Sequence, residues 1–375
     1  MKKLILGIVI CGMAFITISA ISKKDTPTTT NPLTANFTVG NPGIASINAL
    51  SFGPDGILFI GDSKNAAVYA LDTKDNATKS NTDRIVVREI DNKIAASLGT
   101  TSDKIRVTDM AVNPVSKTVY FSVNVADGTP VVLKLNGENL ENVNLKDIGY
   151  SKINLTNPIS EDKKDRRGRS QRASAISDLK YHDGKVMVTG LSNEEFSSTF
   201  RSMPFPFTDA QDHASLEIYH AAHARFETYA PIRTFSVVNI ENKDYLMASY
   251  TCTPLVLFPM DDLKGGTHVK GRTVAELGAG NAPLDMITFE RDGKPHFLMS
   301  NSNRPVMRID YEDIISFKSE LTEPVKGYDT EGVSYTNLPM VNVLQLDNLD
   351  ANNIVYLQRT AGGELILISR PTNRV

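Results

Sequence analysis

The sequence predicts an all-β protein folded as a six-bladed β-propeller. Three observations lead to this prediction: short apolar strands fill most of the chain, the order strand, turn, strand, polar turn, strand recurs six times, and almost no segment has helical periodicity. One small sheet cannot bury both faces alone, but a ring of such sheets can, because each packs against its neighbours. A β-sandwich is the alternative for a short-stranded chain, but it does not explain a fixed order repeated six times.

The stretch GPDGILFIGDSKNAAVYALD, residues 53–72, shows the repeat most clearly. Pro54-Asp55-Gly56 has the composition of a tight turn. Ile57 to Ile60 predicts a buried strand, Asp62 to Asn65 a polar turn, and Val68 to Leu71 a further strand. Five later segments follow the same order. Aligning their turns places six residues at one repeat position, at spacings of 60, 69, 56, 51 and 57 residues: Ala49, Asp109, Asp178, Thr234, Asp285 and Asn342.

The first residues predict export. Residues 1–20 have the pattern of a secretory signal peptide, in which Lys2 and Lys3 precede an apolar run and a small residue at the cut. A membrane anchor is the alternative, but the run is short for a span of roughly 20 residues. We expect a periplasmic or extracellular protein with a flexible tail at 21–32, a single propeller domain at 33–375, and no stable membrane span after cleavage.

The ends of the chain also predict how the ring closes. The sixth unit runs out of residues after Ser369, before an outer strand. The segment Leu33 to Val39 alternates like a strand and belongs to no unit. We therefore expect this N-terminal strand to complete the sixth blade.

Charge and cysteine content exclude some functions. The net charge is −3, and loss of Lys2 and Lys3 with the signal peptide makes it about −5, which gives no general attraction to nucleic acid. Cys11 leaves with the signal peptide, so Cys252 is the only remaining thiol and no intramolecular disulfide is expected. The chain has no tryptophan and no glycine-rich phosphate loop. We expect a protein or small-molecule partner.

Two segments resemble known proteins. PDGILFIGDSKNAAVYALD is similar to one repeat of the NHL, gluconolactonase-like and YncE-like propellers, with a DG turn, an apolar strand and D-S-x-N. The resemblance implies the fold and not a reaction. A gluconolactonase-like metal site would want a glutamate in the first unit, where this chain has Asn48 and Ala49. The segment from Ala222 to Met286, with YTCTPLVLFP and TVAELG, is similar to exported bacterial proteins of uncharacterised function.

The candidate site lies where inner strands begin and where second and third strands are joined, because these positions share one face of a propeller. The binding candidates on this face are Asp109, Asp178, Arg201, His213, Arg233, Cys252, Asp285, Asn303 and Arg304. Asp109, Asp178 and Asp285 have two interpretations. They hold a divalent cation or supply a general base, or each accepts backbone N–H groups at its own strand.

The third unit contains the longest insertion, residues 190–215. A long loop in a compact domain is often a lid, and Arg201 and His213 give it polar side chains. We expect it to fold over the channel mouth or to cover a hydrophobic edge.

Cys252 is either a small buried thiol or a ligand or nucleophile with a partner such as His213. His220 and His223, with Glu217, suggest a metal site, but strand spacing places residues i and i+3 on opposite sides. The basic stretch 165–172 is either a solvated loop or a site for an anionic partner.

Two functions follow from these features. The first is a binding or scaffold propeller that uses this face and the 190–215 loop. The alternative is a metal-dependent, lactonase-like hydrolase with Asp109, Asp178 and Asp285 around the metal. Whether the protein is an enzyme stays open, and a redox role of Cys252 is a third, weaker hypothesis.

Overall fold

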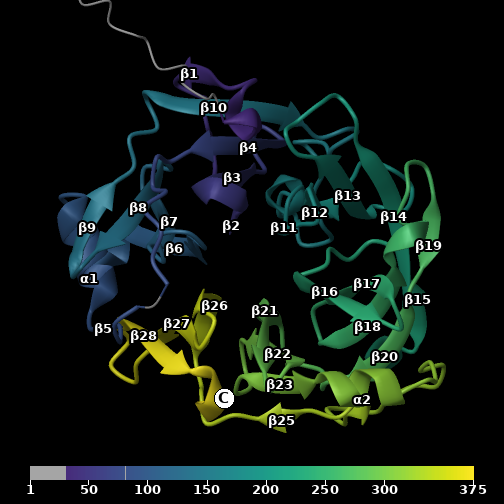
Figure 1. Ribbon diagram of the computed structural model, residues 1–375. Coiled ribbons are helices and arrows are strands. Elements are labelled where there is room, and N and C mark those ends of the chain that lie inside the picture. Colours follow the sequence, from purple (N-terminus) through teal and green to yellow (C-terminus); the bar gives the residue numbers. More distant parts are fainter. Residues whose placement is uncertain (1–30, 81) are drawn as a thin grey trace, which may run out of the picture.

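The computed structural model describes residues 31–80 and 82–375, and in it six small sheets, antiparallel except for the pair β14 and β19, surround a central channel (Figure 1). The predicted six-bladed β-propeller is confirmed. The predicted signal peptide and most of the predicted tail lie outside the described residues. The blades are numbered here in the chain order of their innermost strands.

Each blade begins with its inner strand and continues outward. The first blade holds β2 (Ala49–Phe52), β3 (Ile57–Asp62), β4 (Ala67–Asp72), β10 (Ile148–Asn154) and β1 (Thr38–Gly40), and the second holds β6 (Ile105–Val112), β7 (Val119–Val125), β8 (Pro130–Asn136) and β9 (Asn139–Asn142). The third holds β11 (Asp178–His182), β12 (Lys185–Leu191), β13 (Ser198–Pro204) and β14 (Asp212–His220), with β15 (Arg225–Glu227) and β19 (His268–Lys270) paired to β14.

The other three blades follow the same plan. The fourth holds β16 (Thr234–Ile240), β17 (Lys243–Ser249), β18 (Pro254–Pro259), β20 (Arg272–Glu276) and β24 (Glu331–Gly332). The fifth holds β21 (Pro283–Arg291), β22 (Lys294–Asn301), β23 (Met307–Asp310) and β25 (Thr336–Asn337), and the sixth holds β26 (Val343–Asp350), β27 (Asn353–Arg359), β28 (Leu365–Pro371) and β5 (Val86–Val87). The described residues also form two α-helices, α1 (Ile90–Ser97) and α2 (Tyr311–Ser316), which lie outside the sheets.

The turns between inner and second strands explain part of the repeat. Asp183 and Gly184 have φ of 44° and 73°, and Asp292 and Gly293 have φ of 54° and 71°. A two-residue hairpin turn with both residues in the left-handed region matches the twist of the flanking strands, and Asp-Gly adopts it readily. The DG pairs of the sequence therefore set the first hairpin of the third and fifth blades.

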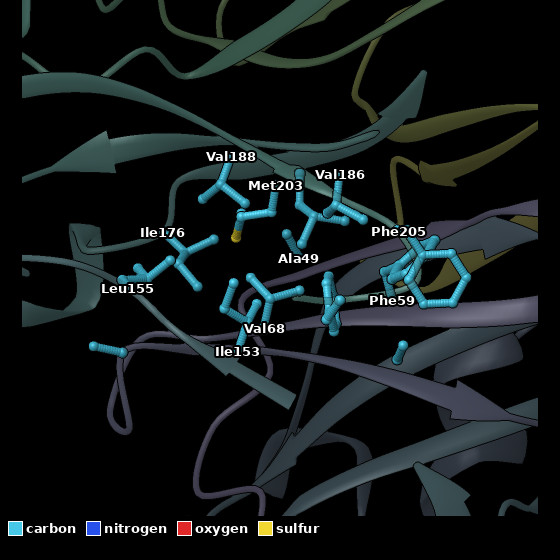
Figure 2. Close-up of a cluster of buried hydrophobic side chains, with 14 of the residues drawn as sticks. Ala49, Phe59, Val68, Ile153, Leu155, Ile176, Val186, Val188, Met203 and Phe205 are labelled. Atoms are coloured by element: carbon cyan, nitrogen blue, oxygen red, sulfur yellow. The ribbon is translucent and has the colours of Figure 1, made fainter. Parts of the chain in front are cut away.

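The order of blades around the ring differs from their order in the chain. Going round, the first blade is followed by the third, fourth, fifth, sixth and second (Figure 1). Six large hydrophobic clusters of the described residues lie one at each junction between neighbouring blades. Figure 2 shows one of them, in which Phe59 and Val68 of the first blade meet Val186 and Met203 of the third. The core is thus a ring of six contacts rather than one central cluster.

Two strands produce this order. After β4 the chain pairs β5 with β28, then builds the second blade between the sixth and the first. It returns through β10, which pairs with β4 as an outer strand of the first blade. The ring is therefore closed by β5 and β10, which both flank the second blade.

The predicted closing strand is wrong. Residues Pro32–Thr34 form a 3₁₀ turn, and β1 pairs with β10 of the first blade, so the N-terminal strand does not complete the sixth blade. The sixth blade takes its fourth strand from Val86–Val87 instead. This two-residue strand is too short to show an alternating pattern, which is why the sequence pointed to the longer N-terminal segment.

The predicted lid is also wrong. Residues 190–215 include the end of β12, the whole of β13 and the start of β14, so most of the segment is part of the third blade. Glu217 and His220 lie on β14, the fourth strand of this blade. Among the described residues, no helix is both long and apolar enough to cross a membrane.

Candidate functional site

Four aspartates of inner strands form a ring of hydrogen bonds in the central channel. Each carboxylate accepts the N–H of the next residue with Oδ1 and an N–H of the neighbouring blade with Oδ2, over 2.7–3.1 Å. The pairs, written as aspartate and neighbouring donor, are Asp109 with Leu50, Asp178 with Phe235, Asp285 with Leu346, and Asp347 with Val112. All four point to the next blade in the same direction around the ring.

These bonds confirm that the aspartates accept backbone N–H groups, and they add the contact between blades. The fourth and fifth blades, which lack an aspartate between them, are joined by the Ser236 and Thr288 hydroxyls at 2.5 Å. At the junction of the first and third blades, the Ser63 hydroxyl accepts the N–H of Ile176 at 3.1 Å. A carboxylate that takes two backbone donors fixes the spacing of two inner strands.

Lys180 and Gln345 lie among the four carboxylates. The Lys180 ammonium donates to the carbonyl of Met286 at 3.0 Å, across the channel from its own strand β11. The Gln345 amide, oriented with its nitrogen toward the carboxylates, donates to Asp109 Oδ1 at 2.9 Å and to Asp285 Oδ2 at 3.2 Å. The carboxyl groups of the four aspartates therefore lie near a single ammonium group, that of Lys180.

This crowding shifts the pKa values of the carboxyl groups. Burial raises the pKa of Asp285 to about 7, against the opposing effect of Lys180, and raises that of Asp347 to about 6. Burial and the charge of Asp285 raise the pKa of Asp109, and burial raises that of Asp178. Low local polarity and nearby like charges both favour the neutral acid. At neutral pH these carboxyl groups are therefore ionised only in part, and their charge depends on what lies near them.

The channel contains a cavity of about 580 Å³. Its lining begins at the aspartates and continues to the far ends of the inner strands, where Phe52, Tyr181 and Phe289 lie. The four aspartates are half-buried rather than closed off, so the cavity reaches their carboxyl groups. It is large enough for a small molecule with a charged end and an apolar body.

Asp109, Asp178 and Asp285, the predicted cation site, line one channel from three different blades. In the described part of the chain, only one group of three possible ligands brings its atoms within 4.8 Å of one another, and it is His220, His223 and Cys252. The three aspartates line the same channel, but Lys180 interacts with all of them. Their oxygens already accept backbone N–H groups, which holds them on separate strands.

Arg201 and His213 lie inside the third blade and not on a lid. Arg201 is fully buried in β13, opposite His213 on β14, and donates to the carbonyl of Thr156 at 3.0 Å. Burial lowers the pKa of Arg201 to about 10. His213 Nδ1 is 3.5 Å from Glu194, and burial followed by the charge of Arg201 lowers its pKa. Neither residue reaches the channel cavity.

The other predicted residues are spread over loops. Arg233 is exposed at the start of β16, near Asp178. Asn303 donates to the carbonyl of Gly280 at 2.7 Å, and Arg304 donates to that of Tyr328 at 3.4 Å, so both fasten a loop of the fifth blade. The structure therefore brings together the three aspartates of the predicted set but not the other six residues.

Cys252 has different neighbours from the one predicted. Its possible partners are His220 and His223 rather than His213. The strand argument against pairing His220 with His223 is wrong because β14 ends at His220 and the 3₁₀ turn Ala221–His223 follows. The turn places the two imidazole rings 3.8 Å apart between centroids.

Sequence reasoning missed Asp347, Lys180 and Gln345. Aligning turns placed Asn342 at the aspartate position of the sixth unit, five residues too early. Aligning Leu346-Asp347 with Leu284-Asp285 would have found the fourth aspartate. No signal marked Lys180, because a lysine in a strand next to a polar turn is most often on the surface.

Known proteins resemble this chain only distantly. No protein-family model matches the chain, and no curated protein matches it. The extracellular domains 1–2 of Drosophila Semaphorin 1b are similar with a TM-score of 0.38 and 10% identity, over 89% of this chain and 86% of that one. The PQQ-bound aldose sugar dehydrogenase from Streptomyces coelicolor has a TM-score of 0.33 and 10% identity, over 89% and 98%.

A streptogramin B lyase structure is similar with a TM-score of 0.34 and 11% identity, over 90% of this chain and 87% of that one. The resemblance of the first repeat to NHL and YncE-like propellers agrees with the six-bladed β-propeller of the structure itself. One fold serves many functions, so the function depends on the site itself.

Proposed function

We propose that this protein is an exported binding propeller that holds the positively charged group of a small molecule in its central channel. The observation that carries the proposal is the set of four carboxyl groups around one ammonium at one end of a cavity of about 580 Å³. A cationic group there gains attraction from several carboxylates in a medium less polar than water. Phe52 and Tyr181, which are partly exposed at the other end, supply an apolar surface for the rest of the ligand.

An organic cation fits this site better than a metal ion. A calcium-type site needs six or more oxygens around one point. Here the carboxylates are held apart by their backbone donors, and no three of them meet within 4.8 Å among the described residues. An ammonium group needs only one or two oxygens in hydrogen-bond reach. The lactonase-like alternative requires a metal at these aspartates, so the same geometry disfavours it.

The test measures affinity for matched ligands at pH 8, where Asp285 is largely ionised. Calorimetry with 1,4-diaminobutane, 1,4-butanediol and Ca²⁺ separates an organic cation from a neutral molecule of the same length and from a metal ion. We expect the diamine to bind most tightly. The Asp285→Asn change should weaken its binding several-fold, and Lys180→Met should strengthen it several-fold, because the two changes remove opposite charges. Both substitutions disturb the channel, and a general loss of stability would weaken binding in both variants. Opposite changes in affinity therefore report the charges and not a loss of stability.

Exposed Glu323 provides the control, because Glu323→Gln removes a carboxylate far from the channel lining. Equal affinity for diamine and diol, or changes of the same sign in the two channel variants, would contradict the proposal. Tightest binding of Ca²⁺ would contradict it in favour of the metal site.

A further inference from the structure

The junction of the third and fourth blades carries a cluster of metal-ligand side chains away from the channel. His220 comes from the end of β14, His223 from the turn after it, and Cys252 from the loop between β17 and β18. One ligand atom of each lies within 4.8 Å of the others. From this geometry we infer a zinc-type metal centre with His220, His223 and Cys252 as ligands.

Glu227 orients both imidazoles. Its Oε2 is 3.0 Å from His220 Nδ1, and its Oε1 is 2.8 Å from His223 Nδ1. A carboxylate bonded to the Nδ1–H group of a histidine fixes the tautomer in which Nε2 carries a free lone pair, and this arrangement is typical of metal-bound histidines. One carboxylate that serves two histidines leaves both Nε2 atoms free to bind the same ion.

Two buried atoms at this point have no partner in the described structure. His220 is 1% exposed and its Nε2 has no hydrogen bond, and Glu276 is fully buried with its Oε1 unbonded. These two atoms are 4.0 Å apart. A buried polar atom without a bonding partner costs free energy of folding. One cation between these two atoms would bond to both and remove that cost. Glu276 is accordingly the fourth ligand.

The distances suit a tetrahedral ion after small movements. Zinc bonds of about 2.0–2.3 Å place neighbouring ligand atoms roughly 3.3–3.6 Å apart. The observed separations are up to 4.8 Å among His220, His223 and Cys252, and 4.0 Å between His220 Nε2 and Glu276 Oε1. His223 is exposed, with 39% of its side chain accessible, so its rotation adjusts its own distances to the other ligands and opens a route for the ion.

The ligand types favour zinc over calcium or magnesium. Imidazole nitrogens and a thiolate are soft donors that Zn²⁺ binds in tetrahedral geometry, whereas calcium and magnesium take oxygens. Two ligands come from the third blade and two from the fourth, so the ion would join neighbouring sheets. This site is separate from the channel, and the inference does not depend on the proposed ligand there.

The experiment loads the reduced, full-length protein with Zn²⁺ or Co²⁺. We expect one equivalent of either ion, a higher melting temperature with zinc, and a thiolate-to-cobalt charge-transfer absorption with cobalt. Cys252→Ser should abolish that absorption, and His223→Ala should weaken binding at least 100-fold. Glu227→Gln should weaken it about 10–100-fold, because the histidines lose their orientation.

His268 supplies a matched control, because it also pairs with a glutamate, with Nε2 3.4 Å from Glu217 Oε2. His268→Ala should leave stoichiometry, affinity and the cobalt spectrum unchanged. Wild-type protein that binds neither ion overturns the inference. Cobalt binding without the charge-transfer absorption, or binding that survives Cys252→Ser with equal affinity, overturns it as well. Circular dichroism of each variant without metal shows that the fold is retained.

Discussion

At the scale of the residue, the aspartate ring makes a prediction about Asp347. Replacing it with alanine removes the acceptor of the Val112 and Asn348 N–H groups, each bonded at 2.7 Å. An unpaired buried donor costs about 1–3 kcal/mol. The loss should be larger at pH 5, where a carboxyl with a pKa of about 6 is mostly neutral, than at pH 8, where the same change also removes like-charge repulsion. Urea unfolding of Asp347→Ala and of the surface control Asp83→Asn at both pH values measures this. A loss that is greater at pH 8 would contradict the prediction.

Single residues could be predicted from sequence only where the repeat marks them. Asp109, Asp178 and Asp285 recur before apolar residues, so their place on inner strands and their backbone bonds could be predicted. Their bonds to the next blade could not, because these depend on which sheets are neighbours. The contact between Cys252 and His220 could not be predicted either, because they lie on different blades and meet only when those blades are neighbours.

At the scale of the element, β5 and not β1 is the strand that completes the sixth blade. Val87 in β5 is 4% exposed and packs in the cluster between the sixth and second blades, whereas Val39 in β1 is 77% exposed. Val87→Ala should cost about 2 kcal/mol through lost burial and a cavity, and Val39→Ala should change stability by less than about 0.5 kcal/mol. Denaturant unfolding of both variants compares them directly. Equal losses, or a greater loss for Val39→Ala, would support closure by the N-terminus.

Strands with their own turns could be predicted, and strands fixed by neighbours could not. The hairpins at Asp183-Gly184 and Asp292-Gly293 have a local cause in their positive φ angles. By contrast, the sequence predicts a loop at β13 because polar residues surround this segment. In the structure it is a strand because it pairs with β12 and β14. Tertiary contacts of this kind override local propensity.

At the scale of the whole molecule, the ring order determines what meets in the channel. The second blade lies between the sixth and the first, so Asp347 bonds to β6 and Asp109 bonds to β2. In a ring built in chain order, β26 would adjoin β2 instead. The sequence could predict six blades because each unit is local, but their order depends on the long connections through β5 and β10.

The same ring predicts how the stability of the molecule depends on pH. Asp285 and Asp347, with pKa values of about 7 and 6, bind protons more tightly in the folded state than in the unfolded state, where aspartate has a pKa of about 3.9. Their contribution is complete below about pH 4 and is lost as the pH rises through 6 and 7. Asp109 and Asp178 shift in the same direction, while Lys180 stays charged throughout.

Other carboxyl groups limit stability at low pH. Despite burial, hydrogen bonds from His296 and Arg308 lower the pKa of Asp310, so its contribution is lost as the pH falls below about 4. We therefore expect the highest melting temperature near pH 5 and a decrease of several degrees by pH 8. Calorimetric melts from pH 4 to 9 measure this profile, and the double change of Asp285 and Asp347 to asparagine should flatten its upper side. A melting temperature that rises from pH 5 to 8 would show that the channel carboxyls are not crowded in the way the structure places them.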